Sequence, residues 1–344
     1  MCIQRELIKS SGEVKSFFVG SLLKLKENPF YGDILKANYS GNKTNDFQYE
    51  THERKINILQ IPCGKCIGCR IDYSRSWADR LTYHSFTTDP SKSWFLTLTY
   101  NDDALDKLDM SSDYGVASLC YDDMTRFIKA LRNKYRDENI DYYYSGEYGD
   151  KSFRCHFHAI LFNVPIKDLE FWKLNHMGQP IYSSRFISDL WKNGFVAIEE
   201  FSWTNAAYVA SYVEKKRDGR LAAEYDACGI LPEKCRMSRR PGISYDFYQN
   251  HYEDIWKNDG MSVSRSVCSS GKLGIPRYFI KLAEKSTDPY SKELLKDFQD
   301  RQLKTANIVN PFKVYNSSFD LSRVGDLLRF QEREILSRKK VKQI

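Results

Sequence analysis

Apolar residues recur along the middle of this 344-residue chain with two different periods, which predict helices and strands in alternation. Spacings of three and four residues, typical of a helix with one apolar face, run through 71–83 and 124–136. The run WFLTLTY at 94–100 is rich in aromatic and β-branched residues and favours a strand. The positions on the two helix faces are Ile71, Ser74, Trp77, Ala78, Leu81 and Tyr83, and Met124, Phe127, Ile128 and Leu131.

Two further strand-like runs, at 141–147 and 153–163, flank the turn signal Gly149-Asp150-Lys151 and predict a hairpin. Together with the helices, they predict an α+β fold around a central antiparallel sheet. The pattern divides the chain into three zones: a Cys-rich segment and its helix at 1–90, a mixed zone at 91–225, and a C-terminal, mainly helical zone at 226–344.

The second strand of this hairpin carries two histidines, His156 and His158, whose side chains share one face because they are two residues apart. Two imidazoles bind a divalent ion weakly without a third ligand, and a carboxylate shifts the preference towards Mg²⁺ or Mn²⁺. Glu147, across the turn, is the best candidate, with Asp102 and Asp103 as rivals. The alternative is a pair of half-buried histidines held only by hydrogen bonds.

The segment TNAAYVASYVEKK at 204–216 predicts a helix with a chemically unusual face. Tyr208, Tyr212 and Lys215 fall on one side of it, and Thr204 is expected to cap its N-terminus. Packing alone is the common reason for two tyrosines at this spacing. The opposite side is a stripe of small apolar residues, Ala206, Val209, Ala210 and Val213.

Beside a metal site, these tyrosines acquire a chemical use. A phenol with an ordinary pKa near 10 is a weak nucleophile at neutral pH. It can attack phosphorus when a metal polarises the phosphodiester and a lysine screens the developing charge. The resulting 5′-phosphotyrosyl bond conserves the bond energy and leaves a 3′-hydroxyl that can prime synthesis. Since a second tyrosine lets cutting and rejoining alternate, the combination predicts a rolling-circle initiator.

Composition adds a nucleic-acid partner and argues against a membrane. Lys and Arg exceed Asp and Glu by 52 to 45, a net charge of +7, and 14% of the residues are aromatic, a combination that suits nucleic acid. No stretch reaches the roughly 18 consecutive apolar residues of a membrane span, and the N-terminus lacks an apolar signal region. We therefore expect a cytoplasmic protein.

The order of the motifs resembles a known family. A His-hydrophobic-His strand after a Gly-Glu hairpin, followed by Tyr-x-x-x-Tyr-x-x-Lys, resembles the HUH endonuclease superfamily. More narrowly, the chain resembles the replication initiators of gokushovirus-type microviruses, which are single-stranded DNA phages. The motifs that carry this resemblance, between residues 2 and about 282, are an N-terminal MC, PCGKCIGCR, SGEYG, HFHAILF, YVASYVEKK, MSRRPGIS and IPRYFIKL.

The resemblance implies a ferredoxin-like or RRM-like palm with helices on one face of its sheet. It also implies Mg²⁺ or Mn²⁺ and nicking of a phage origin in single-stranded DNA by Tyr208 or Tyr212, without saying which attacks first. The expected location is the cytoplasm of a bacterial host. Because the sequence contains no ATPase or helicase motif, a host helicase is expected to act with a host DNA polymerase as partners.

A cysteine cluster predicts a second metal site, of structural zinc. Cys63, Cys66 and Cys69 supply three thiolates within one tight segment, and Zn²⁺ requires four ligands in a tetrahedron. Cys2 is the expected fourth ligand because the resembling proteins also begin Met-Cys. An iron–sulfur cluster, or no metal at all, is the rival interpretation. The alternative fourth ligands are His84, Cys228 and Cys235.

Basic residues at three places are expected to contact DNA phosphates, although a solvated surface is the alternative for each. Arg70 and Arg75 lie on the helix after the cysteines, Arg239 and Arg240 on a turn, and Lys216 after the tyrosines. Two functions compete with the initiator. One is a zinc-stabilised nucleic-acid-binding protein without catalysis, and the other is a metal nuclease that uses water and forms no adduct.

Overall fold

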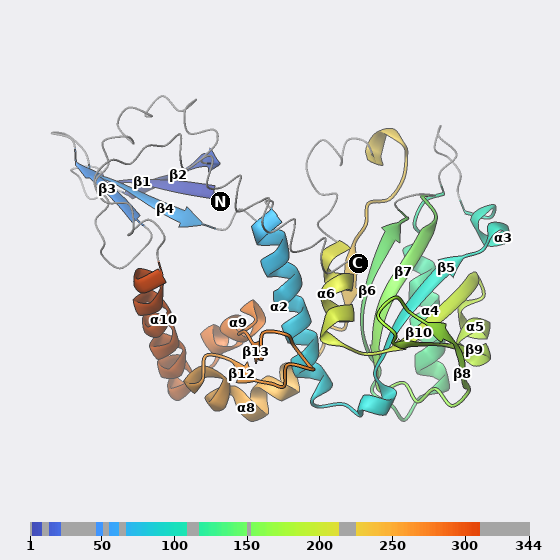
Figure 1. Cartoon of the computed structure of the whole chain (residues 1–344). Coiled ribbons are helices and arrows are strands. Elements are labelled where there is room, and N and C mark those ends of the chain that lie inside the picture. Colours follow the sequence, from blue (N-terminus) through green and yellow to red (C-terminus); the bar gives the residue numbers. More distant parts are fainter. Residues whose placement is uncertain are drawn as a thin grey trace. The chain divides into compact units, whose positions relative to one another are not determined.

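A computed structural model describes eight segments of the chain: 2–8, 14–21, 46–50, 55–61, 67–108, 117–149, 153–212 and 225–309 (Figure 1). Side chains are described within 71–108, 117–149, 153–211 and 225–302. Contacts divide the chain into two compact units, residues 1–70 with 287–344, and residues 71–286. The three predicted zones are functional ones, and they stay a prediction.

The first unit contains a four-stranded antiparallel sheet with the strand order β2-β1-β4-β3. In the pairing of β1 with β4, Cys2 lies opposite Ile61, which precedes Cys63 by two residues in the sequence. The elements of this unit are β1 (Cys2–Ile8), β2 (Val14–Ser21), β3 (Asp46–Glu50), β4 (Lys55–Ile61) and α10 (Pro289–Val309).

The second unit is built on a seven-stranded antiparallel sheet with the order β11-β6-β7-β5-β10-β9-β8. The predicted α+β class with a central antiparallel sheet is thereby confirmed, and β6 and β7 form the predicted hairpin pair. The strands are β5 (Trp94–Tyr100), β6 (Asp141–Tyr148), β7 (Cys155–Phe162), β8 (Leu169–Leu174), β9 (Pro180–Ser184), β10 (Gly194–Glu200) and β11 (Cys235–Met237).

Helices cover both faces of this sheet, so the prediction of helices on one face was wrong. Helices α4 (Tyr121–Lys134) and α5 (Arg185–Trp191) share a core with Leu96, Leu98 and Phe157. On the other face, α2 (Ile67–Ser85) and α6 (Trp203–Tyr212) share a core with Phe95, Tyr143 and Ile160. The physical reason is that the central strands bury apolar residues on both sides, which gives nearly continuous apolar runs.

The remaining described elements of this unit pack against α2. The ring of Tyr83 contacts Phe247 and Phe279, and its hydroxyl donates to the carbonyl of Leu273. Within the described residues, no helix combines the length and apolar character that crossing a membrane requires. These elements are η2 (Pro90–Lys92), α3 (Asp102–Leu105), α8 (Tyr245–Lys257), β12 (Met261–Ser262), β13 (Lys272–Leu273) and α9 (Arg277–Lys285).

Candidate active site

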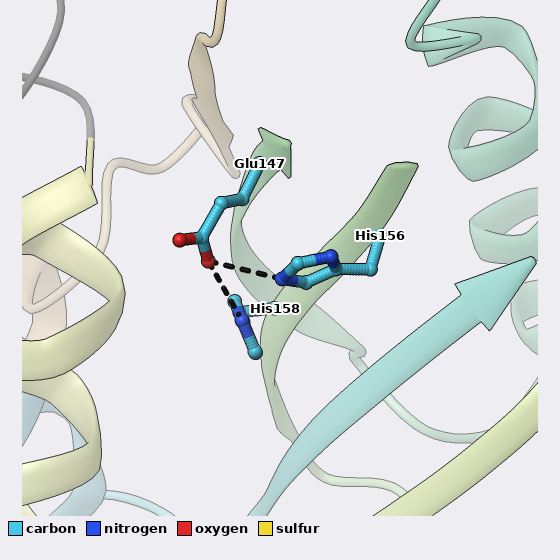
Figure 2. Close-up of side chains that lie close together, drawn as sticks. All are labelled: Glu147, His156 and His158. Carbon is cyan, nitrogen blue, oxygen red and sulfur yellow. Dashed lines mark hydrogen bonds and ion pairs between the residues drawn. The ribbon is translucent and has the colours of Figure 1, made fainter. Parts of the chain in front are cut away.

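The β6–β7 pair brings Glu147, His156 and His158 together on one face of the sheet (Figure 2). Glu147 lies directly opposite His156, and His158 follows two residues along the same strand, so all three side chains project the same way. The Nε2 atoms of both histidines lie 3.1 Å from one atom, Oε2 of Glu147. Among the described side chains, these three form the one group of His, Cys, Asp or Glu that could hold a metal ion.

A second contact fixes the orientation of each imidazole. Nδ1 of His156 lies 3.0 Å from the carbonyl oxygen of Arg154, and since a carbonyl only accepts, this Nδ1 carries a proton. A neutral His156 therefore presents the lone pair of Nε2 to Glu147. Nδ1 of His158 lies 3.1 Å from the hydroxyl of Thr97, which stands opposite it on β5. Outer contacts of this kind orient histidines that bind metals.

Burial and charge leave the cluster in the protonation states that metal ligands need. Burial raises the pKa of Glu147, but hydrogen bonds from His156 and His158 outweigh it and lower the pKa to about 2. Burial also lowers the pKa of His158, against the opposing effect of its hydrogen bond to Glu147. An ionised carboxylate beside neutral imidazole is a donor set for a divalent ion.

Helix α6 brings Tyr208 to the cluster. Its ring meets the ring of His158 edge to face, with centroids 5.1 Å apart, and that of Phe95 at 6.3 Å. Tyr208 is 40% exposed, whereas Ala206, Val209 and Ala210 of the same helix are fully buried, as the predicted stripe requires. The tyrosine ring therefore lies between the candidate ligands and solvent.

The N-terminal cap of α6 differs from the prediction. Thr204 was the predicted cap, but the helix begins at Trp203, and the hydroxyl of Ser202 accepts a hydrogen bond from the N–H of Asn205 at 3.1 Å. Ser202 is the cap because it directly precedes the helix and its oxygen reaches an unpaired N–H of the first turn.

Several predicted site residues lie outside the described side chains. Tyr212 is the last residue of α6, and only its backbone is described. The two metal sites therefore differ in standing, since the zinc site stays wholly a prediction. The other residues in this position are Lys215, Lys216, Arg70, Cys2, Cys63, Cys66 and Cys69.

The rival metal ligands have other surroundings. Asp102 and Asp103 lie in the first turn of α3, and the carboxylate of Asp102 is 84% exposed and accepts a hydrogen bond from Arg154. Of the alternative zinc ligands, His84 accepts a hydrogen bond from the N–H of Ser244. The thiol of Cys235 lies 3.0 Å from the hydroxyl of Tyr143, and Cys228 is a half-buried free cysteine.

An open stretch of sheet continues from the cluster, and sequence reasoning missed it. Across the strands, Glu147 pairs with His156, His156 with Thr99, and Thr99 with Phe195, so the four side chains form one row on one face. Phe195 is 68% exposed. Gly194 holds β10 against β5 here, because its φ is +143° and a Cβ would lie 2.4 Å from the carbonyl oxygen of Thr99. The two threonines of WFLTLTY were the available signal for a polar face.

Comparisons with known proteins assign the family. Residues 93–217, which include the cluster and α6, match the family of the replication-associated protein ORF2. The chain is 31% identical over 274 residues to the replication-associated protein ORF2 of Spiroplasma virus 4, covering 78% of this chain and 82% of that protein. It is 35% identical over 259 residues to the replication-associated protein VP4 of Bdellovibrio phage phiMH2K, covering 71% and 74%.

A third relative is the replication-associated protein ORF4 of Chlamydia phage 1, which is 30% identical over 246 residues, covering 68% of this chain and 56% of that protein. No solved structure matches the chain. The chain belongs to the family of phage replication-associated proteins, and the predicted resemblance to phage replication proteins is confirmed.

Proposed function

We propose that this chain is a replication initiator that nicks phage DNA through a tyrosine and later rejoins it. The observation that carries the proposal is the contact between Tyr208 and His158, because it brings a phenol to a cluster of candidate metal ligands. Membership of a family of phage replication-associated proteins supports DNA as the substrate.

In this proposal, Glu147, His156 and His158 hold Mg²⁺ or Mn²⁺. Two ligand atoms 2.0–2.1 Å from an octahedral ion lie about 3.0 Å apart when they are adjacent, close to the observed 3.1 Å. An ionised oxygen facing the lone pair of a neutral imidazole at this distance also requires a proton or a cation between them. When bound, the ion would polarise a phosphodiester oxygen and stabilise charge that develops on it.

The chain's own residues supply the nucleophile. Oη of Tyr208 or Tyr212 forms a bond to phosphorus, and the bond from phosphorus to the 3′-oxygen breaks. The phenol gives up its proton, and the leaving 3′-oxygen takes one up and becomes a free hydroxyl. Lys215 would stabilise the phenolate and the charge on phosphorus. Because the 5′ end stays on the tyrosine, the 3′-hydroxyl can prime synthesis and the reverse reaction can rejoin the strand.

The substrate in this proposal is single-stranded DNA at the phage origin, in the cytoplasm of an infected bacterium. The open row that ends in Phe195 would carry the strand next to the scissile phosphate, since bases stack on exposed aromatic rings. A host helicase and a host DNA polymerase would unwind and copy the circle, because the sequence contains no ATPase motif.

Structural zinc on Cys2, Cys63, Cys66 and Cys69 completes the proposal. The backbone register supports Cys2 as the fourth ligand, because it stands opposite Ile61 and Cys63 follows two residues later in the sequence. We expect about one tightly bound zinc per chain by elemental analysis, lost together with thermal stability in Cys66→Ser. Cys228→Ser is the matched control and should keep the ion.

The test of the function is to incubate the protein with single-stranded origin DNA and Mn²⁺ and to look for a covalent complex on a denaturing gel. We expect an adduct, and none when EDTA removes the metal. Cleaved DNA without an adduct would identify a nuclease that uses water. DNA binding without cleavage would identify the non-catalytic binding protein instead.

A further inference from the structure

Four arginines gather around a polar hollow at the edge of the seven-stranded sheet. The hollow has a volume of about 600 Å³, and we call it the arginine groove. Arg132 comes from α4, Arg236 from β11, and Arg239 and Arg240 from the segment after β11. The sequence predicted only the last two as DNA contacts. The other described lining residues are Asn139, Asp141, Tyr142, Met237 and Ser238.

The groove is strongly positive because its arginines lack carboxylate partners. Within 71–108, 117–149, 153–211 and 225–302, none of the four guanidinium groups forms an ion pair. Asp141 is the one acidic residue among the described lining residues, and it is buried beside Ser238 with its carboxylate 3.3 Å from Nε2 of His84. Its charge is therefore directed inwards, away from the groove.

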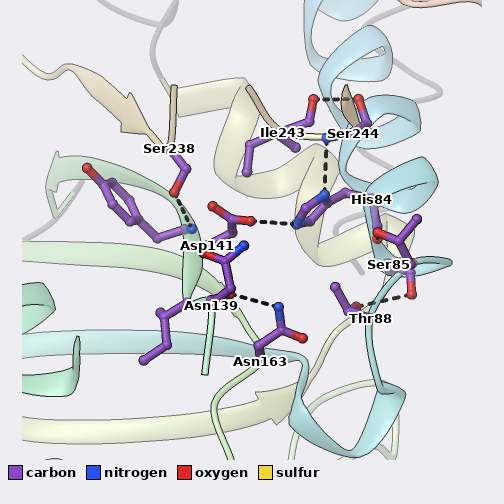
Figure 3. A network of polar contacts seen from close by, with 12 residues as sticks. His84, Ser85, Thr88, Asn139, Asp141, Asn163, Ser238, Ile243 and Ser244 are labelled. Carbon is purple, nitrogen blue, oxygen red and sulfur yellow. Dashed lines mark hydrogen bonds and ion pairs between the residues drawn. The ribbon is translucent and has the colours of Figure 1, made fainter. Parts of the chain in front are cut away.

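The segment that carries Arg239 and Arg240 is fixed at its first residue by the start of β6 (Figure 3). The N–H of Ser238 donates to the carbonyl of Tyr142 at 2.9 Å, and the N–H of Tyr142 donates back to the hydroxyl of Ser238 at 3.2 Å. Arg239 also pairs with Gly242 in an isolated β-bridge, which closes the turn.

Helix α2 holds the other end of the same segment (Figure 3). Nε of Arg80 donates to the carbonyl of Ile243 at 3.0 Å. The N–H of Ser244 donates to Nδ1 of His84 at 3.1 Å, so the proton of a neutral His84 ring is on Nε2, which faces Asp141. With both ends fixed, the two arginines lose little conformational freedom when they bind an anion.

We propose that the arginine groove binds the phosphate backbone of the single DNA strand at a point remote from the cut, an inference that rests on the proposed function. Guanidinium groups match phosphate oxygens in pairs, which favours this ligand. The half-buried ring of Tyr142, with the guanidinium of Arg132 5.4 Å from its centroid, offers a face on which a base can stack.

The position of the groove suits a second hold on one strand. Asp141 and Glu147 are six residues apart on β6, about 20 Å along an extended strand. The groove lies at the first end of β6 and the candidate metal ligands at the other. The groove fixes the strand, while the cluster acts on one of its phosphates.

The experiment measures binding of a fluorescent single-stranded oligonucleotide by anisotropy over a range of salt concentrations, in EDTA so that no cleavage occurs. Arg236→Ala/Arg240→Ala should weaken binding by about tenfold or more at low salt. The slope of log affinity against log salt should fall by about 0.7 for each phosphate that the variant no longer binds. Arg236→Lys/Arg240→Lys should recover part of both effects. Arg185→Ala, which removes an arginine with a 93% exposed side chain from α5, is the matched control.

Melting temperatures keep the result interpretable, and those of the variants should equal that of the wild type because the replaced side chains are exposed. Unchanged affinity and salt slope in a folded double variant would overturn the proposal, and would leave an acidic protein segment as the ligand to examine. The proposed function fails in a different assay, when the wild-type protein forms no covalent adduct with origin DNA. Loss of binding with adduct chemistry retained at high DNA concentration supports the groove and the function together.

Discussion

The ring of Tyr208 stands edge to face against the ring of His158, with 5.1 Å between centroids. This contact places one of the two predicted tyrosines beside the candidate metal ligands. Tyr212 follows four residues later at the end of α6, about 6 Å further along a helix. A small movement of DNA or helix would then bring either phenol to the same phosphorus.

We therefore expect the two tyrosines to replace each other in part. Tyr208→Phe and Tyr212→Phe keep the ring and remove only the nucleophilic oxygen, so each should still form some adduct with single-stranded origin DNA. The double variant should form none, and Lys215→Ala should slow adduct formation by about 100-fold. Denaturing gels with quantified adduct measure all four proteins. Cleavage by the double variant at the wild-type rate would mean that water is the nucleophile.

The identity of the third metal ligand gives a second prediction. Glu147→Gln keeps the size of the side chain and removes its charge, so it should weaken Mn²⁺ binding by more than the 10- to 100-fold typical of removing an outer partner. His156→Ala and His158→Ala should abolish cleavage and leave DNA binding largely intact. Asp102→Asn is the control, because that carboxylate is 84% exposed and pairs with Arg154 rather than with either histidine. Electron paramagnetic resonance of free Mn²⁺ gives the affinities, and equal effects in both variants would reject Glu147.

A third prediction concerns the orientation of His158. Thr97→Val keeps the shape of the side chain but removes the hydroxyl 3.1 Å from Nδ1 of His158. Mn²⁺ affinity should fall by about 10- to 100-fold, with an unchanged melting temperature. Thr99→Val is matched in strand and face, and the hydroxyl of Thr99 bonds neither histidine in the described part of the chain. If both variants bind Mn²⁺ alike, Thr97 does not position the ligand.

How much of this site the sequence could predict depends on how local each signal is. The pairing of His156 with His158 follows from the two-residue period of one strand. The face of Glu147 could not be fixed, because a change of one residue in the turn reverses every side chain of a strand. Thr97 belongs to β5, and it lies 59 residues earlier than His156 in the sequence, so no local pattern connects them.

The same reasoning explains the errors in the fold. Strand β7 reads as a single apolar run, CHFHAILF, which fits burial on one face or on two. Helix α2 lies before the sheet strands in sequence, and nothing in its own spacing tells which face of the sheet it covers. The contact of Ala78 and Leu81 with Phe95 and Ile160 is a tertiary fact, and it decides that both faces are covered.

The Asp141 carboxylate predicts a specific loss of stability in acid. Burial raises its pKa, but hydrogen bonds from His84 and Ser238 outweigh it and leave the pKa below the ordinary value. The stabilisation is therefore complete above the ordinary pKa of about 3.9 and is lost as pH falls through the lower value of the folded state. Urea midpoints should fall over this acid range, with a shallower fall in Asp141→Asn. Asp189→Asn, an exposed carboxylate of α5, should follow the wild type, and an Asp141→Asn curve parallel to the wild type would contradict the assignment.

The exposed ring of Phe195 gives the last prediction, because it ends the row that begins with Glu147 and His156. A base stacked on an aromatic side chain contributes about 1–3 kcal/mol, so Phe195→Ala should weaken binding of single-stranded DNA by about 10- to 100-fold. Phe171→Ala is the matched control. That ring is 62% exposed, but the register of β8 with Tyr182 puts it on the other face of the sheet. Fluorescence anisotropy without divalent metal separates this effect from cleavage. A strand that crosses the open face must distinguish the two variants, and equal losses would mean that it runs elsewhere.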